Sequence, residues 1–156
     1  MEMHKPMAML RYICQANKGK NGECMYPANQ DPDLHWKIEN CVEILSGDFG
    51  NKIGSFCVPT HPDYANKDQN FINFIAKDLP DVLEQLETML NKCNTKYLVD
   101  NCMTMADILF STFLFMLPFN DVYPNQHIVE AVIRKYPKTC CLAECLKSDF
   151  EFMMKK

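Results

Sequence analysis

The chain lacks an excess of positive charge. Its 156 residues hold 16 Lys and Arg against 20 Asp and Glu, which gives a formal net charge of −4 and a pI near 5.5. Binding to duplex nucleic acid depends on clustered cations that neutralise phosphates. The basic clusters at 134–138 and 155–156 are small and are typical of solvated helix ends. We therefore expect no nucleic-acid partner.

The chain also lacks an apolar segment of membrane-spanning length. Its longest apolar run, 108–119, is interrupted by Ser111, Thr112 and Pro118 and falls short of the roughly 20 residues that a spanning helix needs. Residues 1–5 contain no apolar signal-peptide core, and no Arg-rich leader precedes the first predicted helix. We expect no membrane span and a cytoplasmic location.

A metal-binding or disulfide pattern is missing too, although nine cysteines are present. The number is odd, and the one cluster, Cys140, Cys141 and Cys145, has neither C-x-x-C spacing nor a neighbouring histidine. The four histidines are dispersed, and none is paired with a thiol in sequence. Buried thiols in a reducing compartment explain this usage, so we expect no metal.

What the chain does contain is helical periodicity in an ordinary globular composition. With 47% apolar and 23% charged residues, one domain of this length buries about two-thirds of its unfolded surface. Apolar residues recur at helical spacing, and no segment has the pattern of a strand. We predict an all-α fold, a bundle of five to six helices. The expected helices lie at 6–16, 32–46, 67–93, 105–117, 125–136 and 137–153.

The segment between the second and third predicted helices allows two structures. Asp31 and Pro32 are typical of a helix start, and Gly47 is a natural end for that helix. The glycines and prolines of 47–66 then indicate either an ordered loop or a broken extension of the same helix.

The third predicted helix, 67–93, is the longest. We expect it to bend at Pro80. Its acidic positions are expected to face solvent; they are Asp78, Asp81, Glu84 and Glu87.

The most informative feature is the start of the fourth helix. Thr104 is its predicted N-cap, and Asp107, three residues later, completes a capping box in which each residue binds the backbone N–H of the other. The residues that follow are apolar almost all round, which places this helix at the centre of the core.

These motifs resemble a known family. Residues 97–109 look like the LVGD-x-[ST]-x-AD signature of the helical C-terminal domain of cytosolic glutathione transferases, in which this box caps the central helix. Residues 7–13 are similar to the S-x-A-I-L-R-Y opening of the first helix after the last strand of that family's thioredoxin-like domain. Residues 25–27 resemble the L-Y-P that follows. With 74–90 and 134–137, the similarity covers nearly the whole chain.

The resemblance implies a bundle without its usual partner domain. Residues 1–5 are then a remnant of the end of a thioredoxin-like domain, and 6–156 form the glutathione-transferase-like helical domain. The family's last glutathione-binding pair, [QE]-S, reads Lys5-Pro6 here, and proline supplies neither a hydroxyl nor a backbone N–H. The family's Gly-Asp likewise reads Asp100-Asn101, two residues that tolerate a turn. We therefore assign no cofactor and no catalytic residue.

Two function classes follow from the resemblance. The first is a non-catalytic helical module that acts in protein–protein association, or as a structural subunit of a larger assembly, with a protein partner or a second copy. The alternative is a glutathione transferase whose glutathione-binding half is supplied elsewhere or is missing from this chain; only then is glutathione a cofactor. A third possibility is apolar-ligand binding without chemistry. We expect association, because fold similarity alone does not carry activity.

Each class points to particular residues. In the family, dimers form through the two helices that correspond to 6–16 and 32–46, so Arg11, Tyr12, Glu39 and Glu43 are the interface candidates. An enzyme or an apolar-ligand carrier instead needs a hydrophobic wall. By resemblance its candidates come from two regions of the chain; they are Phe49, Phe56, Phe150 and Phe152.

Overall fold

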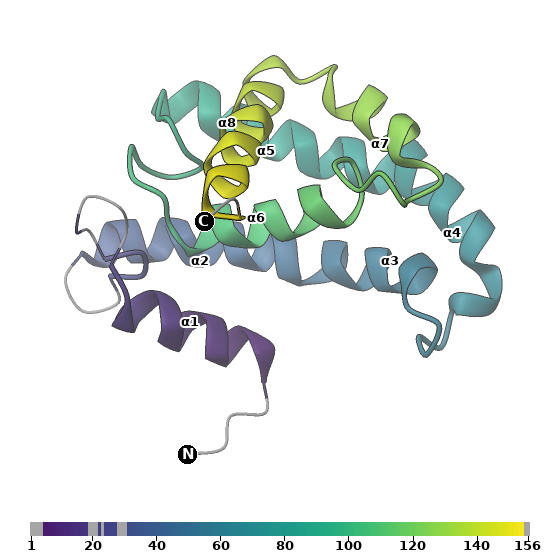
Figure 1. Cartoon of the computed structure of the whole chain (residues 1–156), viewed down its shortest axis with the longest axis horizontal. Helices are drawn as coiled ribbons and strands as arrows, with labels where there is room; N and C mark the ends of the chain where they lie inside the picture. Colours follow the sequence, from purple (N-terminus) through teal and green to yellow (C-terminus); the bar gives the residue numbers. More distant parts are fainter. Residues whose placement is uncertain (1–4, 19–21, 23, 28–30, 155–156) are drawn as a thin grey trace.

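The computed structural model describes residues 5–18, 22, 24–27 and 31–154, with the backbone alone for residue 48 and for residues 151–154. Figure 1 shows the chain as a set of packed helices. Their bounds are α1 (Pro6–Ala16), α2 (Pro32–Ser46), α3 (Asp48–Cys57), the 3-10 helix η1 (Tyr64–Asn66), α4 (Lys67–Asn73), the π-helix η2 (Phe74–Asp78), α5 (Leu79–Cys93), α6 (Met105–Met116), α7 (Gln126–Ile133) and α8 (Pro137–Met154).

The all-α prediction is confirmed. With α2 and α3, and α4 through α5, each taken as one interrupted helix, the described residues form six helices. The nearest approach to a strand in this part of the chain is a single bridge between Lys18 and Cys24. No helix among the described residues is both long and apolar enough to cross a membrane.

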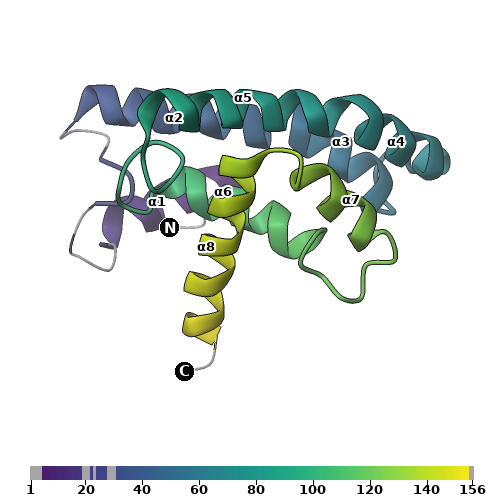
Figure 2. The ribbon, with the colours of Figure 1, turned by 90° about the horizontal axis from the view of Figure 1, so that it is seen from above.

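The helices are arranged around α6. In Figure 1 α2 and α3 run in line along one side of the bundle, and α4 and α5 return along the other. Helix α8 packs on α5 and α6, and Figure 2 shows its C-terminal part extending beyond the other helices. Helix α1 lies at the edge, on the side away from α5, where it contacts α6.

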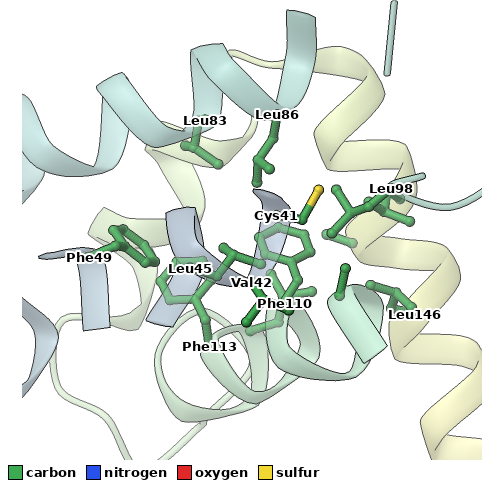
Figure 3. Packing of buried hydrophobic residues seen from close by; sticks show 14 of the residues in the cluster. Cys41, Val42, Leu45, Phe49, Leu83, Leu86, Leu98, Phe110, Phe113 and Leu146 are labelled. Carbon is green, nitrogen blue, oxygen red and sulfur yellow. The ribbon is translucent and has the colours of Figure 1, made fainter. Parts of the chain in front are cut away.

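The core is continuous through the middle of the bundle. Phe110 and Phe113 of α6 point to a layer of side chains from α2, α3, α5 and α8 (Figure 3). The layer includes Cys41, Val42, Leu45, Phe49, Leu83, Leu86 and Leu146, all buried. Burying a large apolar side chain contributes about 1.5–3 kcal/mol to the free energy of unfolding, so this layer is the main source of stability.

The segment after Gly47 is partly a broken extension of α2. Residues 48–57 form α3, and a turn with η1 connects it to α4. At Gly47 the chain approaches itself so closely that a Cβ atom would lie 2.7 Å from the Glu43 carbonyl oxygen. Glycine therefore allows the helix to break and resume within one residue.

The long third helix is irregular just before Pro80 rather than at it. Residues 74–78 form the π-helix η2, and Pro80 then lies in the first turn of α5. Proline has no N–H and its ring clashes with the carbonyl four residues earlier in α-helical geometry. The wider π turn accommodates both effects, so α4, η2 and α5 continue without interruption.

Candidate functional site

The start of α6 is fixed by a buried carboxylate. Asp107 is fully buried, and Thr104 and Asp107 form a capping box. Oxygen Oδ2 of Asp107 accepts hydrogen bonds from the Thr104 backbone N–H (2.8 Å) and hydroxyl (2.9 Å). Oxygen Oδ1 accepts one from the Leu98 N–H (2.9 Å). The carboxylate thus joins the 98–104 turn to the central helix.

Burial also changes the protonation of this group. The apolar surroundings of Asp107 raise its pKa to about 6, and the hydrogen bonds from Leu98 and Thr104 oppose that rise. The preceding turn does not need the left-handed conformation at Asp100 or Asn101. Among the described non-glycine residues, a positive φ occurs at Asn94 alone, at the end of α5.

Helix α1 is joined to α2 by a polar pair, Arg11 and Glu39. The Arg11 guanidinium donates to Glu39 from Nε (2.9 Å) and from Nη2 (2.7 Å), in a bidentate pair. The Arg11 hydrogen bonds hold the pKa of Glu39 below its ordinary value, and Glu39 raises the pKa of Arg11. Cys14 is the one residue of α1 that is buried.

The segment after α1 completes this network. The Tyr26 hydroxyl donates to Glu39 Oε1 (2.6 Å) and lies 2.9 Å from His35 Nε2. Burial raises the pKa of the Tyr26 phenol, and the neighbouring Glu39 raises it further. The Met25 carbonyl accepts from the Met105 N–H (3.0 Å), so this segment also binds the first turn of α6.

The outer side of α1 is apolar and exposed. Met9, Tyr12 and Ile13 are 38%, 58% and 48% exposed, and their spacing places them on one stripe of the helix. Their neighbours Met7 and Leu10 pack against the core instead. On α2, Trp36 is 68% exposed, on the side away from the buried Ile38 and Val42. We name Met9, Tyr12, Ile13 and Trp36 the α1–α2 face.

The interface candidates from the sequence occupy two environments. Arg11 and Glu39 bind each other within the chain. Tyr12 and Glu43 are exposed and accessible to a partner. Trp36 was not predicted from the sequence. The spacing of a single aromatic residue one turn after a helix start does not show whether its side chain faces the core or solvent.

The candidate residues for a hydrophobic wall do not form one surface. Phe49 and Phe56 are only 4% and 8% exposed, and both pack against Phe74. Phe150 of α8 packs instead against Phe115, with ring centroids 5.9 Å apart. The side chain of Phe152 lies outside the described residues. In this structure Phe49 and Phe56 are therefore core residues and not the lining of an open pocket.

Lys5 and Pro6 act at the start of α1. Pro6 is the first residue of the helix, and the Lys5 carbonyl accepts from the Met9 N–H at 3.0 Å. Residues 1–4, the rest of the predicted thioredoxin-like remnant, lie outside the described residues.

Glu87 has a role that its position on an acidic helix side did not indicate. Its carboxylate accepts from the N–H groups of Lys138 (3.0 Å) and Thr139 (2.8 Å) and from the Thr139 hydroxyl (2.8 Å). Partial burial acts to raise the pKa of Glu87, but these hydrogen bonds outweigh it, and the pKa is lowered. A side chain of α5 thus caps the first turn of α8, which begins with Pro137. Lys138 and Thr139 lie 51 and 52 positions after Glu87, and no sequence rule links residues so far apart.

The thiols are dispersed as the sequence indicates. None of the nine cysteines, all of which lie among the described residues, forms a disulfide, and Cys14 and Cys41 are fully buried. Within the described residues, no group of three or more His, Cys, Asp or Glu side chains is placed to hold a metal ion.

The fold and these motifs define a member of one family. The family described as glutathione S-transferase, C-terminal domain, matches residues 47–148. The chain belongs to this family. It is also similar to a diazinon-metabolizing glutathione S-transferase in the silkworm, Bombyx mori, at 23% identity, with 94% of this chain and 68% of that chain covered and a TM-score of 0.47. No curated protein matches the chain.

Proposed function

We propose that this protein is a non-catalytic glutathione-transferase-like helical module that acts in protein–protein association through the α1–α2 face. The exposed stripe of α1 carries the proposal. Helix α1 buries Cys14 on its inner side and presents Met9, Tyr12 and Ile13 to solvent. Large aromatic and aliphatic groups of this kind are typical anchors of protein interfaces.

The support of α1 fits such a role. A contact surface needs a fixed helix, and the Arg11–Glu39 pair with Tyr26 fixes this one without using its apolar outer residues. Exposed aromatic surface adds to this. Tyr12 and Trp36 are 58% and 68% exposed, and exposed aromatic side chains are enriched at protein interfaces.

Site-specific cross-linking tests the proposal directly. A photoreactive residue replaces Tyr12 in the full chain, and in a control it replaces Val122, which is 88% exposed but lies between α6 and α7. We expect a discrete cross-linked species in cells of the source organism from position 12 and none from position 122. Equal cross-linking from both positions, or from neither, contradicts the proposed surface.

A second measurement separates association from catalysis. The purified chain is applied to immobilised glutathione and assayed for conjugation of an electrophile. We expect neither retention nor turnover. Turnover above the uncatalysed rate overturns the non-catalytic proposal, whatever the cross-linking shows.

A further inference from the structure

A polar cleft lies between α3 and the helix that follows it. Its volume is about 100 Å³, and all its lining residues are polar, although 47% of the chain is apolar. Asn51, Lys52 and Ser55 come from α3, and Asn73 and Asp78 come from α4 and η2. No lining residue of the cleft belongs to the α1–α2 face, and the cleft plays no part in the function proposed above.

Two amide groups of the cleft are held in defined orientations. The Asp63 N–H donates to His61 Nδ1 (3.2 Å), so the proton of the neutral ring is on Nε2, which then donates to Asn51 Oδ1 (3.1 Å). The Gln69 side chain donates to Asn73 Oδ1 (3.0 Å). Each asparagine therefore keeps its NH₂ group for another acceptor, and neither NH₂ has a partner among the described residues.

The cleft also contains charges of both signs. Lys52 supplies an ammonium from α3, and Asp78 and Asp63 supply carboxylates from η2 and the connecting turn. Neither Lys52 nor Asp78 forms an ion pair within the described part of the chain. Asp78 is the last residue of η2, and π turns occur frequently at functional sites.

We propose that this cleft binds a small α-amino acid in its zwitterionic form. Lys52 and the Asn51 amide bind the carboxylate, and Asp78 binds the ammonium. The volume of the cleft corresponds to that of about three water molecules in the liquid, which suits a ligand of the size of alanine or serine. A simple anion is repelled by the two carboxylates, and an apolar ligand meets a lining in which every residue is polar.

The experiment is a titration of the full isotope-labelled chain, followed by amide chemical shifts. L-alanine is the probe, and acetate and methylamine each carry one of its two charges. We expect saturable shifts confined to α3, α4 and η2, with a Kd on the order of 1 mM for L-alanine. Acetate and methylamine are expected to bind about tenfold more weakly or worse, because each lacks one ion pair.

Variants assign the two ends of the ligand. Lys52→Met and Asp78→Asn are each expected to weaken L-alanine binding by about tenfold or more. Lys77→Met and Asp68→Asn are charge-matched controls, because these residues lie on η2 and α4, which both contribute to the cleft, but do not line it. Unchanged melting temperatures show that the variants are folded. Binding of acetate as tight as that of L-alanine, an absence of saturable shifts, or equal losses in the controls would overturn the proposal.

Discussion

At the scale of single residues, Asp107 combines two opposing effects. Its carboxylate satisfies three donors at the start of α6, yet it lies in the core, where ionisation is unfavourable. The second effect is the larger, because the pKa of Asp107 is raised from 3.8 to about 6. The protonated form therefore contributes stability that is fully present below pH 4 and is lost as the pH rises through 6.

This sign gives a testable pH dependence. On going from pH 7 to pH 5, we expect the free energy of unfolding of the wild type to rise relative to that of Asp107→Asn by roughly 1 kcal/mol. Denaturant titrations at both pH values measure it. The comparison with the variant cancels the opposite contribution of carboxylates such as Glu87, whose pKa is lowered. A difference that is constant with pH, or that falls towards pH 5, contradicts the raised pKa.

Thr104 tests the cap without changing a charge. Thr104→Ala removes the hydroxyl that binds Asp107, and we expect a loss of about 1–2 kcal/mol in the free energy of unfolding. Thr104→Ser keeps the hydroxyl and is the matched control, with an expected loss of less than half as much. Equal losses in the two variants would show that the methyl group, and not the hydrogen bond, is responsible.

At the scale of helices, α8 begins on a cap supplied by α5. Glu87→Ala removes the acceptor for three donors of Lys138 and Thr139, and we expect a cost of about 1–2 kcal/mol. Amide exchange should increase most in the first turn of α8. Glu84→Ala, at an exposed position one turn earlier, is the control and should change stability by less than about 0.5 kcal/mol. Equal protection of the first turn in both variants contradicts the cap.

Helix α1 depends on Arg11 for its polar attachment to α2. Arg11→Ala leaves Glu39 without its bidentate partner, and we expect faster amide exchange across residues 7–16 with little change in α5 and α6. Arg134→Ala breaks the exposed Arg134–Glu130 pair of α7 and is the control, with no expected change in the amide exchange of residues 7–16. Uniform loss of protection over the whole chain would mean that α1 is an integral part of the core.

These helices also show what the sequence can determine. The starts of α2 and α6 follow from local chemistry, Asp31 with Pro32 and Thr104 with Asp107, and both lie where the sequence places them. The π turn and the Glu87 cap do not follow from it. The first depends on how the whole helix accommodates Pro80, and the second joins segments that only the packed bundle brings together.

The same distinction applies to the candidate site. Family resemblance selects Arg11 and Glu39 as interface candidates, but their mutual contact depends on how α1 crosses α2. Phe49 and Phe56 have the composition of an apolar wall, and periodicity cannot tell a core residue from a pocket residue when both are apolar. The sequence therefore determines which residues are apolar, and the packing determines which of them a partner can reach.

At the scale of the whole molecule, the cysteines report how the protein opens. Cys14 and Cys41 are both fully buried, and burial raises the pKa of their thiols to about 11 and about 12. The thiolate is the reactive form, so both should resist a disulfide reagent at pH 8, whereas exposed Cys93 and Cys141 should react at once.

The two buried thiols should nevertheless react at different rates. Cys14 is exposed when α1 alone detaches, whereas Cys41 lies in the central layer and is exposed only when the bundle opens. We therefore expect mass spectrometry of time-resolved labelling to show Cys14 modified well before Cys41, and Arg11→Ala to accelerate Cys14 only. Simultaneous modification of the two thiols would mean that α1 and the rest of the bundle unfold as one cooperative unit. It would contradict our interpretation that α1 can detach while the core stays folded.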